Sequence, residues 1–346
     1  MKGLVKYAPG AGSIELRELP EPAPGPGEVK CKVIRAGICG SDVHVIKGEM
    51  GCTPPVVLGH EFVGRIVELG EGVKKYSVGQ RVTAEIGHHL CGTCEYCRDS
   101  YINMCVERKS MGYVYDGVFA EYVIIPERDI VPVPEEIDAN EAALIEPLAC
   151  CCRACFDFTP IQPGMLVVVL GPGPMGQMNA QIVRAMGAKV LVAGTTHSTP
   201  RLEMAKKLGA DYIVDFQKED LRAKVLELTG GYGANVVMEC SGTDSAVNMG
   251  LDILRKEGAL IQFAAHAGMG STIDWLRIFQ KELRIYGAMS SISHNWPQAV
   301  KLLENHQVNL KPLSDAVYKL EDWEKALEKY DSKTAYKVVF NIGDDN

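Results

Sequence analysis

Four cysteines lie close together in one short polar stretch of the chain. The segment reads HLCGTCEYCRDSYINMC, and its cysteines follow the spacing C-x2-C-x2-C-x7-C. Four thiolates that a single folded loop can bring together are the ligand set of a closed, tetrahedral structural zinc site. The alternative is a disulfide cluster, which would need an oxidising compartment. We therefore predict a structural zinc bound by Cys91, Cys94, Cys97 and Cys105.

Three further motifs, far apart in the sequence, supply a second set of candidate metal ligands. A cysteine, a histidine and carboxylates together form a mixed sulfur, nitrogen and oxygen set, which is typical of a catalytic zinc with one exchangeable position. Each motif alone is a weak signal, because a buried cysteine is more often a core residue and a His-Glu pair can belong to a turn. The motifs are GICGSDVH, GHEF and EPL, and their candidate ligands are Cys39, His60, Glu61 and Glu146.

A glycine-rich motif of the form G-x-G-x-x-G predicts a dinucleotide site. It follows the apolar run Val167–Leu170 and opens a helical pattern, which is the context that separates this motif from an ordinary glycine-rich turn. The glycines allow a tight turn, a close approach of the backbone to pyrophosphate, and close packing of the helix, whose N-terminus attracts the phosphates. The predicted cofactor-binding residues here are Gly171, Gly173, Pro174, Met175 and Gly176.

The end of the next predicted strand bears on which dinucleotide is bound. A carboxylate at this place usually binds the ribose 2′-hydroxyl of NAD. The strand KVLVAG instead ends at Gly194, and Thr195, Thr196 and Arg201 follow it. Hydroxyls and a cation suit a 2′-phosphate, although Arg201 could simply be a solvated charge at a helix start. We expect NADP, or the use of both NADP and NAD.

Composition limits the class of protein. A chain of 346 residues predicts two domains, and 47% hydrophobic and 23% charged residues are typical of a globular enzyme. The net charge of −8 argues against a nucleic-acid or anionic membrane surface as partner. The N-terminal stretch has no apolar signal core, and adjacent cysteines such as Cys150–Cys152 are poor disulfide partners and better core residues. We expect a cytoplasmic protein with a small-molecule substrate.

The elements that must position these residues change in character along the chain. The first part has short β-type runs separated by Gly and Pro turns, which predicts an antiparallel or barrel-like β domain. Strands and helices then alternate, which predicts a parallel, doubly wound sheet of the Rossmann type in an α/β protein. We expect one domain over residues 1–148 and 290–346 and the other over 149–289, with the C-terminal strand YKVVFNI returning to the first.

The three kinds of motif, in this order, resemble the zinc-dependent medium-chain alcohol dehydrogenase superfamily, and the resemblance covers nearly the whole chain. It implies a GroES-like catalytic domain beside the Rossmann domain. The motif Glu146-Pro147-Leu148 resembles the polyol branch, which includes sorbitol (L-iditol) and polyol-phosphate dehydrogenases. VVLGHEF, EPLACC and AKKLGAD are most similar to enzymes of the D-arabitol-phosphate dehydrogenase type.

The resemblance also implies roles for individual residues. Zinc would be bound by Cys39 and His60, with Glu61 and Glu146 as carboxylate ligands, directly or through water. Ser41 would take the proton of the substrate hydroxyl, and His44 would pass it to solvent. A structural alternative for Ser41 is that it caps a helix that begins near Asp42. Substrate-pocket residues are expected from His44–Met50, Met111–Tyr115 and the loop Ala288–His294.

Other functions and the state of assembly remain open at this level. A threonine-type or other secondary-alcohol dehydrogenase is the alternative within the family, although such enzymes typically carry Asp-Pro where this chain has Glu146-Pro147. An inactive NADPH-binding sensor is a further alternative, against which stands the presence of the relay and ligand residues. The strand LRIYGAM, Leu283 to Met289, is expected at a sheet edge that pairs with a second copy, which predicts a homodimer or homotetramer.

Overall fold

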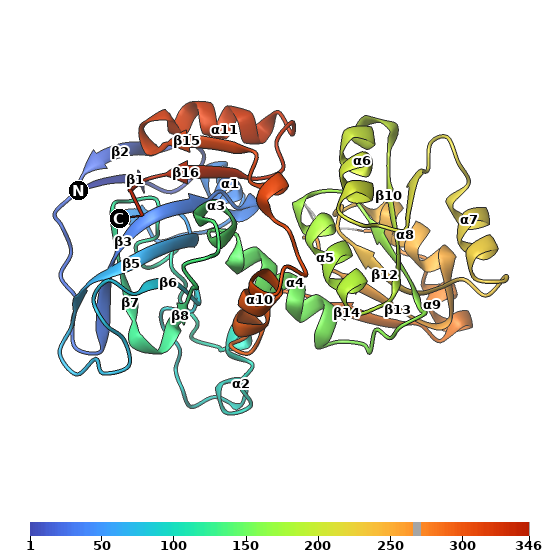
Figure 1. Cartoon of the computed structure of the whole chain (residues 1–346), viewed down its shortest axis with the longest axis horizontal. Coiled ribbons are helices and arrows are strands. Elements are labelled where there is room, and N and C mark those ends of the chain that lie inside the picture. Colours follow the sequence, from blue (N-terminus) through green and yellow to red (C-terminus); the bar gives the residue numbers. More distant parts are fainter. Residues whose placement is uncertain (266–270, 346) are drawn as a thin grey trace. The chain divides into compact units, whose positions relative to one another are not determined.

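The computed structural model describes residues 1–265 and 271–345, which form two compact units. Unit 1 contains Met1–Ala149, Ile292–Glu304 and Leu310–Asn346. Unit 2 contains Cys150–Ser291 and the short segment Asn305–Asn309. Figure 1 shows the elements of each unit coloured along the chain. Both ends of the sequence therefore fold into the same unit.

Unit 1 is built mainly from antiparallel strands. Its larger sheet has seven strands in the order β15-β16-β3-β5-β6-β8, with β7 also paired to β3, and its smaller sheet has the order β2-β1-β4. The side chains between these strands form one hydrophobic core. The strands are β1 (Lys2–Lys6), β2 (Ile14–Glu18), β3 (Glu28–Gly37), β4 (Val56–Val57), β5 (Glu61–Leu69), β6 (Arg81–Ala84), β7 (Tyr122–Pro126), β8 (Ile130–Pro132), β15 (Ala316–Lys319) and β16 (Val338–Asn341).

Short helices connect these strands, and a longer one lies on β15 and β16. That helix, α11 (Trp323–Asp331), is the amphipathic stretch DWEKALEKY of the sequence, and it buries Ala326. The final strand pairs with β3, which confirms that the C-terminal segment returns to the first unit. The other helices of unit 1 are α1 (Gly40–Ile46), α2 (Glu95–Arg98), α3 (Ala139–Ala142) and α10 (Asn295–Glu304); α4 (Ile145–Phe156) contains the boundary between the units.

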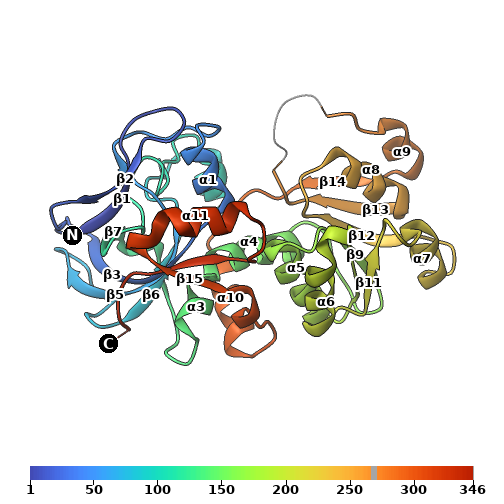
Figure 2. The ribbon, with the colours of Figure 1, turned by 90° about the horizontal axis from the view of Figure 1, so that it is seen from above.

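Unit 2 is a six-stranded parallel sheet in the order β11-β10-β9-β12-β13-β14. Figure 2 shows α5 and α6 on one side of this sheet and α8 and α9 on the other. The central strands β9, β10 and β12 are short apolar runs that are buried on both faces, as expected where helices cover both sides, whereas the edge strand β14 is largely exposed. Its elements are β9 (Leu166–Leu170), α5 (Pro174–Ala185), β10 (Lys189–Gly194), α6 (Thr199–Lys207), β11 (Tyr212–Asp215), α7 (Leu221–Leu228), β12 (Ala234–Glu239), α8 (Asp244–Ile253), β13 (Leu254–Gln262), α9 (Trp275–Lys281) and β14 (Arg284–Gly287).

The strand order of unit 2 identifies the Rossmann topology. In chain order it reads 3-2-1-4-5-6, so the direction of winding reverses between β9 and β12. Ligands of such sheets bind outside the carboxyl ends of the strands at this reversal. The glycine motif follows β9 directly and therefore lies there. The predicted α/β class with a β-rich domain and a parallel doubly wound sheet is confirmed. Among the helices that the structure describes, none has the length and apolar character to span a membrane.

Candidate functional site

Strand pairing in unit 1 brings the first two ligand motifs together. β3 pairs with β5 so that Gly37 lies opposite Glu61; His60 directly precedes Glu61, and Cys39 follows Gly37 by two residues. Ligand atoms of Cys39, His60 and Glu61 all lie within 4.8 Å of one another. A Cβ at Gly37 would be 2.3 Å from Glu61 Oε2, so a larger residue there would displace this carboxylate. Two motifs separated by about twenty residues thus form one potential metal site.

Asp42 supports both Cys39 and His60. Cys39 is the N-cap residue of α1 in extended conformation, and its backbone N–H donates to Asp42 Oδ2 at 2.9 Å. The other oxygen, Asp42 Oδ1, lies 3.3 Å from His60 Nδ1. This carboxylate occupies one ring nitrogen of His60 and leaves Nε2 for a metal, which is the usual arrangement behind a metal-bound histidine.

The electrostatics of this group favour a bound cation. Burial alone would lower the pKa of His60, but its neighbours Tyr113 and Asp42 raise that pKa well above its ordinary value. Surroundings that favour a proton on a buried ring also favour a metal ion in its place. The thiol, imidazole and carboxylate donors, brought close together in a mostly buried group, fit a zinc ion.

Lys337 holds the carboxylate of Glu61 from the far end of the chain. Its Nζ donates to Glu61 Oε1 at 2.7 Å and to the Ile38 carbonyl oxygen at 2.9 Å, and the lysine is only 5% exposed. Burial opposes the ammonium charge, but Glu61 raises the pKa of Lys337 above its ordinary value. Sequence reasoning did not identify Lys337. Its only signal was a lysine that opens an otherwise apolar strand, KVVF, near the C-terminus.

Ser41 and Tyr113 lie next to this group. The Tyr113 ring is 5.6 Å from the His60 ring, and Ser41 is close enough to its hydroxyl to influence the pKa of Tyr113. Burial raises the pKa of Tyr113 to about 12, so its phenol stays protonated. The structure rules out the capping alternative for Ser41, because α1 begins at Gly40 and its N-cap is Cys39. Ser41 lies inside the first turn, where its hydroxyl is not needed to start the helix.

His44 follows Ser41 by three residues on α1 and is largely open to solvent. The exposed fraction of its side chain is 45%, and Nδ1 lies 2.6 Å from Glu49 Oε2. Residues three apart on a helix lie on the same face. The hydroxyl of Ser41 and the imidazole of His44 thus lead from the buried group toward solvent along a single helix turn.

Glu146, the remaining predicted ligand, lies in the first turn of α4 and is 5% exposed. It does not belong to the group of described residues whose ligand atoms are within 4.8 Å of one another. The structure therefore brings together three of the four predicted ligands. Cys150 follows Glu146 by one helical turn, and Cys151, Cys152 and Cys155 are buried free thiols, as predicted for core residues.

The four-cysteine lobe has the geometry of a tetrahedral metal site. Cys91 Sγ lies 3.9 Å from Cys97 Sγ and 3.6 Å from Cys105 Sγ, and all four sulfurs fall within 4.8 Å of one another. Zinc–sulfur bonds of about 2.3 Å in a tetrahedron require sulfur–sulfur distances of about 3.8 Å. Backbone N–H groups of Thr93 and Cys94 lower the pKa of the Cys91 thiol, which favours the thiolate that binds metal. None of the cysteines forms a disulfide.

Each glycine of the motif in unit 2 meets a different structural requirement. Gly171 has a φ of +102°, and a Cβ there would lie 3.0 Å from the backbone of Cys240. A Cβ at Gly173 would meet no atom within 4 Å, so the space beside it is open for a pyrophosphate. A Cβ at Gly176 would be 2.0 Å from the Gly171 carbonyl oxygen, which shows how closely α5 packs on the turn. Pro174 and Met175 begin α5, whose N-cap is Gly173.

The structure adds a carboxylate beside the predicted 2′-phosphate residues. Thr196 Oγ1 donates to Asp215 Oδ2 at 2.7 Å, and Asp215 ends the neighbouring strand β11. The sequence analysis considered only the end of β10 and did not identify Asp215. The parallel pairing of Gly194 with Asp215 brings this carboxylate beside the end of β10. Thr195 lies beside Thr196, and the Arg201 carbonyl oxygen accepts from Gln177 of α5. A Cβ at Gly194 would lie 3.0 Å from the ring of Pro172, so a side chain at this position would be crowded.

Comparisons with known proteins agree with this architecture. Residues 25–135 match the family described as alcohol dehydrogenase GroES-like domain, and residues 174–305 match zinc-binding dehydrogenase. A sorbitol dehydrogenase from Halalkalibacterium halodurans is 43% identical, covering 98% of both chains. D-arabitol-phosphate dehydrogenase from Enterococcus avium is 40% identical, covering 98% of this chain and 97% of its own. A structure from Sinorhizobium meliloti 1021, described as a zinc-binding dehydrogenase bound to NADP, has a TM-score of 0.91 at 28% identity, covering 98% of both chains.

The fold and the two cysteine-containing centres define a zinc-dependent oxidoreductase that uses NAD(P). The chain belongs to the zinc-binding alcohol dehydrogenase family, with its GroES-like domain in unit 1 and its Rossmann domain in unit 2.

Proposed function

We propose that this enzyme oxidises a secondary hydroxyl of a polyol or polyol phosphate to the corresponding ketose, and catalyses the reverse reduction. The observation that carries the proposal is the buried group of Cys39, His60 and Glu61 with Ser41 and His44 on the adjoining helix. The substrate class is supported by the sorbitol and arabitol-phosphate dehydrogenases that share about two-fifths of its sequence. A bound zinc would polarise the substrate oxygen, and NAD(P) would exchange hydride with the substrate carbon.

In this proposal, Cys39 and His60 bind the zinc, and Glu61 and Glu146 are carboxylate ligands, directly or through water; Lys337 pairs with Glu61. Asp42 orients His60 through the ring nitrogen that faces away from the metal. The ammonium of Lys337 balances the negative charge that Glu61 brings to the metal site. Cys91, Cys94, Cys97 and Cys105 bind the second, structural zinc.

Ser41 and His44 would carry the proton in this reaction. A hydroxyl accepts one proton while it donates another, so Ser41 can take the substrate proton without itself becoming charged. His44, exposed and paired with Glu49, can pass that proton on to solvent.

For the cofactor we propose the use of both NADP and NAD. The predicted hydroxyls and Arg201 suit a 2′-phosphate, whereas Asp215 beside Thr196 suits the free ribose hydroxyl of NAD. Arg201→Gln should therefore weaken NADP binding more than NAD binding, and Asp215→Asn should do the reverse. Measurement of the dissociation constants of both dinucleotides for each variant tests this assignment. Equal effects on both cofactors would contradict it.

We also propose a homodimer or homotetramer that forms through the edge of the Rossmann sheet. Strand β14 pairs with β13 on one side, and Ile285 on it is 45% exposed. The nearby helix α9 exposes Trp275 by 73% and Phe279 by 81%, which is unusual for large apolar side chains. Phe279→Glu with Ile285→Glu should convert the assembly to monomers in light scattering. A wild-type protein that is already monomeric at micromolar concentration would contradict the proposal.

We also propose a cytoplasmic location, which the four-cysteine lobe supports because its thiols must stay reduced to bind a metal. Cell fractionation checks this.

The central test of function is a substrate panel on zinc-loaded protein with both cofactors: sugar alcohols, their phosphates, threonine and simple secondary alcohols. Turnover should be highest for a polyol or its phosphate. Preference for threonine would favour the threonine-type alternative, and no turnover of any compound would favour a sensor.

A further inference from the structure

A cavity lies at the opposite end of the Rossmann sheet from the glycine motif. Its volume is about 160 Å³, comparable with cavities that hold a benzene-sized molecule. It opens beside the amino ends of β12, β13 and β14, whereas the glycine motif follows the carboxyl end of β9. The cavity is therefore separate from the dinucleotide site, and neither predicted metal centre contributes to it. It is lined by Thr159, Pro160, Met165, Asn235, Val236, Arg255, Glu257, Ala259 and Arg284.

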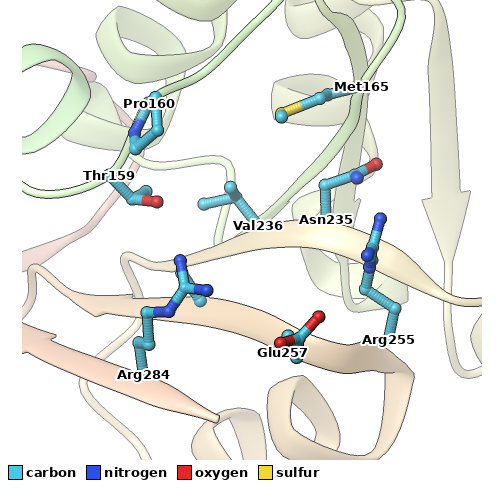
Figure 3. Close-up of a pocket in the computed structure, with 9 residues that line it drawn as sticks. Thr159, Pro160, Met165, Asn235, Val236, Arg255, Glu257 and Arg284 are labelled. Atoms are coloured by element: carbon cyan, nitrogen blue, oxygen red, sulfur yellow. The ribbon is translucent and has the colours of Figure 1, made fainter.

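Two arginines enter this cavity without a carboxylate partner. Figure 3 shows the Arg284 guanidinium on the side of Thr159 and the Arg255 guanidinium on the side of Asn235, with Glu257 between them. In the part of the chain that the structure describes, neither arginine forms a salt bridge; Arg255 Nε donates to the Lys256 carbonyl oxygen at 3.1 Å. Guanidinium groups present forked donors that match phosphate and carboxylate oxygens.

Neutral donors complete the lining. Thr159, a residue 7% exposed, contributes a hydroxyl to the lining. Asn235 Oδ1 accepts from the Leu166 N–H at 2.9 Å, which leaves the two N–H donors of its amide for a ligand. These two side chains add neutral hydrogen-bonding groups to the two guanidinium groups of the lining.

The backbone of β13 is distorted in a way that presents these groups. The pairing of β12 with β13 shifts register between Ala234 and Val236, so Arg255 and Glu257 lie in an irregular segment opposite Asn235. Glu257 has a φ of +58°, a left-handed conformation that is uncommon for a glutamate. Such irregularities re-aim side chains and are found near functional sites.

We propose that this cavity binds a small hydroxylated anion, whose phosphate or carboxylate group contacts Arg255 and Arg284 and whose hydroxyl donates to Glu257. The two guanidinium groups supply the charge, Thr159 and Asn235 supply further donors, and the volume limits the ligand to a few carbon atoms beyond the anionic group. The proposal does not depend on the substrate of the catalytic site.

The test is calorimetric titration of the zinc-loaded enzyme, saturated with NADP so that the glycine motif is occupied. The probes are inorganic phosphate, glycerol phosphate and glycerate. We expect binding of at least one of them with a dissociation constant of about 1 mM or below. Arg255→Gln and Arg284→Gln should each raise that constant about tenfold or more, corresponding to about 1.4 kcal/mol.

Lys256→Gln is the matched control, because Lys256 is exposed on the same strand and does not line the cavity. It should change the dissociation constant less than twofold, and all variants should retain the wild-type melting temperature. Glu257→Gln should strengthen the binding of inorganic phosphate, because it removes a repelling charge. It should also reduce the ratio by which glycerol phosphate binds more tightly than inorganic phosphate. Preference between glycerol phosphate and glycerate distinguishes a phosphate from a carboxylate ligand. No binding up to about 10 mM, or binding that both arginine variants leave unchanged, would overturn the proposal.

Discussion

The two cysteine-containing centres of unit 1 each have a cysteine at the start of a helix, but different parts of the chain hold their other residues in place. In each, a cysteine is the extended N-cap residue of a short helix: Cys39 for α1 and Cys94 for α2. The lobe takes all its ligands from residues 91–105 and relies on its own backbone N–H groups. The other centre draws on distant segments, with Asp42 behind His60 and the buried Lys337 behind Glu61. A centre made by one loop serves stability, whereas one assembled from several segments can combine ligands with a proton path.

The largest effect should come from removing the thiolate of the catalytic centre. Cys39→Ser should lower turnover by about a thousandfold or more, because it weakens the ion that stabilises developing charge by several kcal/mol. The melting temperature should hardly change, since serine is a preferred N-cap residue and keeps the start of α1. Steady-state kinetics, metal analysis and thermal unfolding measure the three quantities. Full activity with two zinc ions bound would remove Cys39 from the ligand set.

The matched change in the lobe should give the opposite result. Cys94→Ser also replaces an N-cap cysteine by a good capping residue, so a loss of stability reports on the metal and not on the helix. We expect the melting temperature to fall by about 10 °C or more, because structural zinc contributes directly to folding. The kcat of the protein that remains folded should stay within about twofold of wild type. A large loss of kcat with normal stability would show that the contrast between the centres is wrong.

The buried ion pair distinguishes the catalytic centre from the lobe. Lys337→Met should destabilise the protein by about 3–5 kcal/mol, because it leaves the Glu61 carboxylate buried without its partner. Lys319→Met, an exposed lysine on the neighbouring strand β15, is the control and should change little. Adding Glu61→Gln to Lys337→Met should recover part of the stability, which denaturant unfolding can measure. If the double variant is no more stable than Lys337→Met, the pair is not the cause.

A smaller effect is expected from the proton path, which the lobe does not have. Ser41→Ala should lower kcat by about 100-fold with little change in melting temperature, because Ser41 does not cap α1. His44→Ala should cause a milder loss that added imidazole partly restores, since solvent can replace an exposed relay group. Glu49→Gln, which removes the partner of His44, should have the smallest effect. An active Ser41→Ala enzyme would exclude the relay.

Local spacing was enough to predict several features. The four-cysteine lobe and the glycine motif are each contained in a few residues, and their geometry follows from turns and helix starts within the same segment. The Rossmann topology followed from alternating strands and helices, because buried parallel strands require helical crossovers. The candidate ligands Cys39 and His60 were identified by residue type, and the structure places them together.

The sequence by itself thus determined the fold class, the sulfur site, the glycine turn and the chemical types at the catalytic centre. Tertiary structure alone decided which distant side chains meet there. Strand register places Glu61 opposite Gly37, the returning C-terminal strand delivers Lys337, and parallel pairing puts Asp215 beside the end of β10. It also showed that α1 begins before Ser41. These features depend on contacts between residues far apart in the chain, and no local spacing encodes them, because register and strand order are set by packing of the whole unit.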